Sequence, residues 1–263
     1  MMTVSSADIV RRESLSELRQ LAAWFRIKHG LERTLLGGWA VYSYNSYIGS
    51  FDIDCLGPLD PFLHQLNIYM SANGYVLEAD SDYGAASESW KKPVINEEVR
   101  IGEIYIDACD FDFRNVFKEN PAKDVPYTLC INNNLTERRP IESDYFYVPV
   151  KELLFLYKMK AARDRDYVLK HETLPAPVIQ RQQGKIEKDY ADLASLLDPR
   201  YGGAMDGSVL GDLIRKHDLS FIVDTISRLI DHQGTVNYCS QRSTTKSELS
   251  QWADKILQDS GFA

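Results

Sequence analysis

The sequence predicts an α+β protein with a mixed first part and a helical second part. In residues 1–149, short apolar or alternating runs indicate strands, and longer segments with apolar residues at helical spacing separate them. After Pro149 only helical patterns follow. We therefore expect a small mixed sheet flanked by helices in residues 1–149 and a helical lobe in residues 150–263.

Local signals in chain order justify each element. Leucines at helical spacing predict a helix over residues 14–29, which His29-Gly30 ends. The rest of the first part is predicted as a strand at 34–36, a helix at 39–47, a strand at 50–56, a helix from Pro61 to Ala72, and strands at 75–78, 99–111 and 145–148. Residues 80–96 stay unassigned and residues 115–144 are expected to be rich in loops. Helices of the second part are predicted over 151–165, 185–197, 209–217, 220–232 and 247–258.

Composition narrows the class of protein. The 263 residues are 44% hydrophobic and 26% charged, as in soluble globular proteins. No apolar run approaches the ~20 residues that cross a bilayer, and residues 1–12 lack the layout of a secretory signal, so we expect a cytoplasmic protein with no membrane partner. The four cysteines form no Cys-x-x-Cys pair, which argues against a zinc site. A net charge of −8 argues against an extended basic surface but allows a local basic groove.

Two aspartates stand one residue apart in the strand predicted over residues 50–56. Alternate strand residues point to one face about 7 Å apart, so Asp52 and Asp54 share a face while Ile53 and Cys55 share the other. Two carboxylates on one face of an apolar strand repel each other and lose hydration, and a divalent cation relieves both effects. Oxygen ligands suit Mg²⁺, so the pair predicts a magnesium site.

A site with two metal ions usually needs a third carboxylate. The strand predicted over residues 99–111 offers Asp107, which apolar residues flank on both sides. If this strand lies beside the first, opposed side chains would lie about 5 Å apart. The alternative is an aspartate near a strand end that bonds a turn.

Gly37-Gly38 stands where a strand is predicted to turn into a helix. Glycines there let the backbone approach a ligand, and the amides of a helix N-terminus favour an anion such as a triphosphate. A Gly-Gly pair alone more often marks a turn. Followed by Asp-x-Asp on the next strand, it indicates a phosphate site.

This order of motifs resembles the DNA polymerase beta-like nucleotidyltransferase superfamily, in which Gly-Gly or Gly-Ser opens a helix and Asp-x-Asp follows. It is most similar to the AbiEii and MenT toxin nucleotidyltransferases, and aminoglycoside nucleotidyltransferases open in a similar way. The motifs here are Gly37-Gly38-Trp39-Ala40-Val41 and Ser50-Phe51-Asp52-Ile53-Asp54. Toxin relatives commonly place a serine where Ser50 stands, which implies a nucleotide-binding role. They usually have an arginine two residues earlier, where this chain has Ile48.

The second part extends the resemblance. Toxin-type members carry a helix with lysine, alanine and arginine, and then a helix with Arg/Lys-Asp-x-x-Asp-Leu. Residues 156–165 and 188–193 match these two patterns. The resemblance implies that Lys158 contacts nucleotide phosphates, with Lys160 as the fallback, and that Asp189 holds the active site or assists the chemistry. The segment that links the two patterns, residues 166–184, is longer than the resemblance leads us to expect.

Structural roles compete with these assignments. Lysines on an amphipathic helix ordinarily face solvent, and helical aspartates such as Asp189 and Asp192 ordinarily face water or pair one turn away. The five histidines show no metal-ligand spacing. Packing roles are expected for Tyr42, Tyr44 and Tyr47, whereas Tyr83 and Trp90 are candidates for stacking on a base or an acceptor.

The resemblance implies magnesium-dependent transfer of a nucleotidyl group from a nucleoside triphosphate to an acceptor hydroxyl. The implied catalytic residues are Asp52, Asp54, Asp107, Lys158 and Asp189; the first three would hold two Mg²⁺ ions, and Gly37, Gly38, Ser50 and Lys158 would contact the nucleotide. The acceptor would be tRNA in a toxin-like enzyme with a partner antitoxin, or a small molecule in an aminoglycoside-like one. A non-catalytic relative that only binds nucleotide would carry the same motifs, and an unrelated α+β protein could contain Asp-x-Asp by accident.

Overall fold

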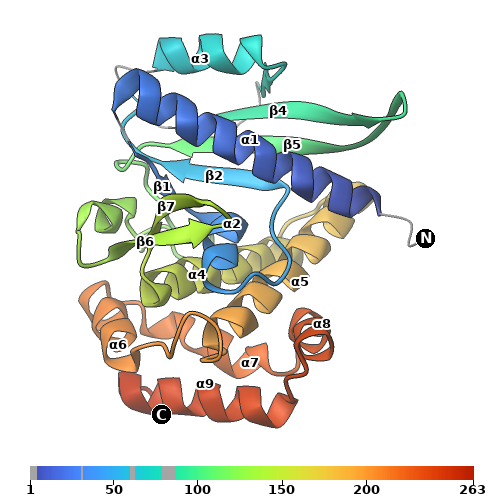
Figure 1. The fold of residues 1–263 in the computed structure, drawn as a ribbon. Coiled ribbons are helices and arrows are strands. Elements are labelled where there is room, and N and C mark those ends of the chain that lie inside the picture. The colour runs from blue at the N-terminus through green and yellow to red at the C-terminus, as the bar shows by residue number, and fades with distance from the viewer. Residues whose placement is uncertain (1–4, 31, 60–62, 79–86) are drawn as a thin grey trace. The chain divides into compact units, whose positions relative to one another are not determined.

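The structure, a computed structural model, describes residues 5–30, 32–59, 63–78 and 87–263 (Figure 1). It is an α+β protein that divides into two compact units. The first unit comprises Met1–Ser43, Ile48–Phe113 and Pro126–Pro149, and the second comprises Tyr44–Tyr47, Arg114–Val125 and Val150–Ala263. Pro61, the predicted first residue of a helix, and Tyr83, a predicted stacking residue, lie outside the described residues.

Seven strands among the described residues form one mixed sheet in the first unit, in the order β3-β4-β5-β2-β1-β7-β6. Their bounds are β1 (Thr34–Leu35), β2 (Asp52–Leu56), β3 (Val76–Leu77), β4 (Ser87–Asn96), β5 (Val99–Cys109), β6 (Thr136–Ile141) and β7 (Asp144–Pro149). The pairs β2–β5 and β1–β7 are parallel, and the other neighbouring pairs are antiparallel. The expected mixed sheet is therefore confirmed.

Helices pack against one face of this sheet, which we call the helix face (Figure 1). These are α1 (Ser6–His29) and α3 (Leu63–Ala72), whereas α2 (Gly37–Tyr44) lies between β1 and β2 in the chain. Trp39 of α2 donates from Nε1 to Ser14 Oγ of α1 over 3.1 Å, and Trp90 of β4 donates to Asn67 Oδ1 of α3 over 3.2 Å. The helix α1 begins earlier than predicted because Ser5 caps it by accepting a hydrogen bond from the Asp8 amide.

The segment left unassigned at residues 80–96 contains β4, which pairs with β5 along its whole length. Glu97 and Glu98 connect the two strands, with φ angles of 48° and 68°. Trp90 is only 2% exposed. The prediction that Trp90 stacks on a base or an acceptor is therefore wrong, because its ring belongs to the core. The loop-rich segment before β7 contains the edge strand β6 and a short 3₁₀ helix, η2 (Tyr127–Ile131).

The second unit is helical. Its elements are α4 (Lys151–His171), α5 (Ala176–Leu197), α6 (Gly207–Lys216), η3 (Ser220–Ile222), α7 (Asp224–Leu229), α8 (Gln233–Arg242) and α9 (Lys246–Ser260). Both α4 and α5 extend into the predicted long link, so that only residues 172–175 separate them. The predicted helix at 220–232 is broken into η3 and α7, and α8 was not predicted. None of the described helices is both long and apolar enough to cross a membrane.

Candidate functional site

Three predicted aspartates lie on one face of two adjacent strands. In the parallel β2–β5 pair, Asp54 is opposite Asp107 and Asp52 is opposite Tyr105. Neighbouring strands are about 4.8 Å apart, so the carboxylates of Asp54 and Asp107 extend from adjacent backbones. Ile53, the intervening β2 residue, is fully buried on the helix face. We call the opposite face, which carries these aspartates, the carboxylate face.

A serine on the next strand holds Asp107. Ser89 of β4 lies opposite Asp107 in the β4–β5 register, and its Oγ donates to Asp107 Oδ1 over 2.5 Å. Because β4 flanks β5 on the side away from β2, this bond draws one oxygen of Asp107 away from Asp54. Sequence reasoning missed Ser89, because its strand carried no recognised pattern.

Gly37 lies directly against the carboxylate of Asp54. It begins α2 with a φ of +61°, in the left-handed region that favours glycine. A Cβ added there would overlap Oδ2 of Asp54, and the Leu36 amide donates to the Asp54 carbonyl over 2.8 Å. The start of α2 and the aspartate strand therefore approach as closely as the backbone allows. Gly38 and Ser50 are buried nearby in the same unit, and Ile48 is half-buried.

The donor set suits magnesium, although the described side chains are not gathered around one point. Among the described residues, no group of three or more His, Cys, Asp or Glu side chains converges in the geometry of a metal cluster. Asp52 and Asp54 alone meet the usual requirement of Mg²⁺ for one or two protein carboxylates. The residues present therefore fit the ion.

The cysteines near these strands are poor nucleophiles. Burial raises the pKa of the Cys55 thiol to about 11, and it also raises the pKa of Cys109. Both thiols are therefore protonated at neutral pH. The chemistry available on the carboxylate face is that of oxygen ligands.

In the second unit, Lys158 is buried between two aspartates of the neighbouring helix. Its Nζ lies 2.7 Å from Asp192 Oδ2 and 3.3 Å from Asp189 Oδ1. Lys158 is 8% exposed, Asp192 is 1% exposed and Asp189 is 4% exposed. Lys158 therefore does not belong to a solvated helix face, and that alternative is wrong.

Further cations complete this ion-pair group. Arg165 pairs with Asp189, and Lys188 lies 3.0 Å from Asp192. Burial alone would raise the pKa of Asp192, but the ammonium groups of Lys158 and Lys188 lower it below its ordinary value. The fallback residue Lys160 pairs instead with Asp164 over 2.6 Å. The group joins α4 to α5, and its three cations outnumber the two carboxylates by one.

The remaining predicted groups have packing roles. Tyr42 packs on Trp39 and Tyr47 packs on Tyr238, both edge to face. The ring of His232 stacks on Tyr190, and burial lowers its pKa. His64 and His171 are exposed.

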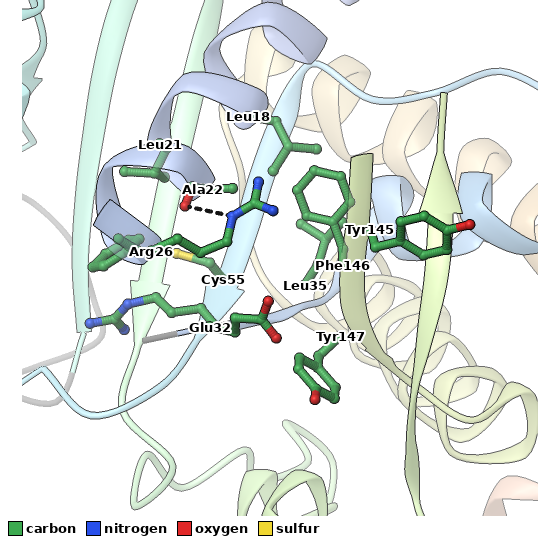
Figure 2. Close-up of a pocket in the computed structure, with 12 residues that line it drawn as sticks. Leu18, Leu21, Ala22, Arg26, Glu32, Leu35, Cys55, Tyr145, Phe146 and Tyr147 are labelled. Atoms are coloured by element: carbon green, nitrogen blue, oxygen red, sulfur yellow. Dashed lines mark hydrogen bonds between the residues drawn. The ribbon is translucent and has the colours of Figure 1, made fainter. Parts of the chain in front are cut away.

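A pocket of about 450 Å³, including space open to solvent, lies on the helix face of the first unit (Figure 2). It is lined by Leu18, Leu21, Ala22, Phe25, Arg26, Glu32, Arg33, Leu35, Cys55, Tyr145, Phe146 and Tyr147. Because Cys55 points away from Asp52 and Asp54, the pocket is separated from the aspartates by the sheet. It is therefore not the predicted phosphate site.

Comparison with protein-family models found no match to this chain. A search of curated proteins likewise found no significant relative.

Proposed function

We propose that this protein is a magnesium-dependent nucleotidyltransferase of the polymerase beta-like kind. The observation that carries the proposal is the close approach of Gly37, at the start of α2, to Asp54, with Asp52 and Asp107 on the same sheet face. In this arrangement the start of α2 lies against the carboxylate of Asp54, which supports the binding of a metal-bound phosphate there.

In this proposal Asp52 and Asp54 would hold the magnesium ion, and Asp107 would help to hold a second one through the oxygen that Ser89 does not contact. The bound ions supply charge neutralisation at the phosphates and lower the pKa of the acceptor hydroxyl. The amides of Gly37 and Gly38 would contact the triphosphate. Ser50, two residues before the start of β2, would also contact the nucleotide.

The proposed reaction is one displacement at the alpha phosphorus. The acceptor oxygen forms a bond to that phosphorus, the bond to the beta-phosphate oxygen breaks, and pyrophosphate leaves. The hydroxyl proton passes to solvent or to a nearby carboxylate. Such a reaction needs positioning groups and charge stabilisation, which the amides at Gly37 and Gly38 and the ions held by the aspartates would supply.

Lys158 and Asp189 enter the proposal through the ion-pair group of the second unit. Their mutual pairing supports a role for Asp189 of α5 in holding α4, the helix that carries Lys158. Contact between Lys158 and nucleotide phosphates stays a prediction, and it requires the ammonium to exchange one aspartate for a phosphate oxygen.

The test is incubation of the protein with each labelled nucleoside triphosphate, MgCl₂ and a cell extract, followed by identification of the labelled molecule. We expect one nucleotide to be transferred with release of pyrophosphate, and Asp52→Ala to abolish the transfer. Label on tRNA would indicate a toxin-like enzyme, in which case a partner antitoxin is expected, and label on a small molecule would indicate an aminoglycoside-like one. Nucleotide binding without pyrophosphate release, or full activity of Asp52→Ala, would refute the proposal.

A further inference from the structure

Two exposed tyrosines and an arginine gather on strands β6 and β7 of the first unit. Tyr145 is 53% exposed and Tyr147 is 37% exposed. Arg138 lies directly opposite Tyr147 in the β6–β7 register, and its Cζ is 5.6 Å from the Tyr145 ring centre and 5.8 Å from the Tyr147 ring centre. We call Arg138, Tyr145 and Tyr147 the tyrosine platform.

The tyrosine platform lies on the carboxylate face. Thr34 of β1 is opposite both Tyr147 of β7 and Leu56 of β2, so these three residues share one face of the sheet. Asp54 lies two residues before Leu56 and points the same way. Phe146, between the two tyrosines, points toward Leu18 of α1 and into the helix-face pocket, which Tyr145 and Tyr147 border from the neighbouring positions of β7 while their rings point elsewhere (Figure 2).

The separation of platform and aspartates limits what could occupy both. The strand order places β7 two strands from β2, about 10 Å across the sheet. Thr34 and Leu56, which lie between, are buried. A ligand that reaches the aspartates and the tyrosine platform together must therefore span a covered row, which favours a chain of linked units over a small molecule.

The chemistry of the platform favours flat aromatic groups. Exposed tyrosine rings beside a guanidinium form the type of surface on which unpaired bases stack. Electrostatic attraction to phosphates contributes little to binding at the platform. Arg138 is paired with Glu32 at 3.7 Å, and the whole chain carries a net charge of −8. Recognition of bases rather than of phosphates is therefore the expected mode, and bases are accessible only where they are unpaired.

We propose that the tyrosine platform holds an unpaired base of a single-stranded nucleic-acid acceptor while the acceptor hydroxyl lies at the aspartates. This inference rests on the proposed nucleotidyl transfer for the role of acceptor. Binding of the strand itself does not depend on catalysis, so the two proposals can fail separately.

The test is fluorescence anisotropy of a short, unstructured, fluorescein-labelled oligoribonucleotide with the whole chain, without nucleotide. We expect Tyr145→Ala and Tyr147→Ala each to weaken binding about tenfold, and Tyr147→Phe to stay within about twofold of the wild type because the ring is retained. Tyr167→Ala is the matched control, since this tyrosine lies in the second unit against His171. The same oligoribonucleotide annealed to its complement should bind more weakly.

Equal binding by the wild type and both alanine variants would overturn the platform, as would loss of binding in Tyr147→Phe equal to that in Tyr147→Ala. Failure of the wild type to bind the oligoribonucleotide, together with nucleotidyl transfer to a small molecule, would overturn the platform alone. Ring-dependent binding in a chain that releases no pyrophosphate would instead support the platform as a binding site and refute the proposed transfer.

Discussion

Two pairs of aspartates in this protein have opposite surroundings. In the second unit, Asp189 and Asp192 are buried and face Lys158, with Lys188 and Arg165 as additional cations. In the first unit, Asp54 faces another carboxylate across the strand pair, with a glycine against its side chain.

The difference shows how surroundings assign a role to the same residue type. Buried aspartates with cations of their own stabilise a fixed helix pair, and breaking one partner leaves an uncompensated charge. Two aspartates opposed across a strand pair repel each other, and a divalent cation between them relieves that repulsion. The first arrangement stabilises a helix pair, and the second is the one that we propose to bind an ion.

The largest expected effect comes from Asp54→Asn. Nucleotidyl transfer should fall about a thousandfold, because a metal ligand supplies several kcal/mol of transition-state stabilisation. The free energy of unfolding without Mg²⁺ should stay within about 0.5 kcal/mol or rise, since repulsion is relieved. Thermal unfolding with and without MgCl₂ measures the contrast: Mg²⁺ should raise the Tm of the wild type only. An equal rise in the variant would contradict the assignment.

Lys158→Met should reverse that pattern. The variant removes the buried cation between Asp189 and Asp192 and leaves them only the more exposed Arg165 and Lys188 as partners, so we expect the free energy of unfolding to fall by about 3 kcal/mol. Lys170→Met is the control on the same helix, because its ion pair with Asp166 is exposed and should contribute less than about 0.5 kcal/mol. Equilibrium unfolding in urea measures both, and equal stability of the two variants would count against the buried group.

Gly37→Ala should damage stability and transfer together. The added Cβ overlaps the Asp54 carboxylate and the backbone is in the left-handed region, so a loss of about 2 kcal/mol is expected. Gly184→Ala is the matched control in α5, where a Cβ meets no atom within 4 Å and helix propensity should add up to about 1 kcal/mol. Thermal unfolding and transfer assays of both variants check this, and a fully active Gly37→Ala would be inconsistent with the close approach.

Ser89→Ala should have a smaller effect on transfer alone. It removes the hydrogen bond that orients Asp107, and loss of such a partner of a metal ligand typically reduces activity or metal affinity about tenfold. We expect the Mg²⁺ concentration for half-maximal rate to rise, and Ser89→Thr to restore it. A lower rate with an unchanged Mg²⁺ requirement would mean that Ser89 has only a packing role.

The smallest expected effect is on the stability of the protein at low pH. The pKa of Asp192 is lowered in the folded protein, so its contribution to stability is present above the unfolded-state value and is lost as the pH falls through the folded value. Below about pH 4 the free energy of unfolding should therefore fall by about 1 kcal/mol more in the wild type than in Asp192→Asn. Urea unfolding between neutral and acidic pH measures this, and parallel curves would argue against the lowered pKa.

Sequence predicted those features that depend on local pattern. The helix α1, the strand that carries Asp52 and Asp54, and the alternating strand with Asp107 all follow from periodicity, and the β2–β5 pairing was anticipated as a condition for a shared site.

The missed strand β4 has two physical reasons. Pro93 interrupts its pattern, and the hairpin turn places Glu97 and Glu98 in the left-handed region, where Asn-Gly would have been the recognisable signal. Without β4 the role of Ser89 was invisible. The burial of Lys158 could not be predicted either, because it depends on which face of α5 meets α4 rather than on either helix alone.

The pairing of β1 with β7 has a consequence for how the chain folds. Thr34 and Tyr147 are paired in space although they lie far apart within residues 1–149. In contrast, many contacts among α4 to α9 join helices that are close in the sequence. Long-range strand pairing closes a large loop and is slow, while local helix contacts form fast. During synthesis, β1 remains a sheet edge until β7 emerges from the ribosome, and an unpaired edge invites association with other chains. Because β1 is only two residues long, the edge that stays unpaired until β7 is synthesised is short.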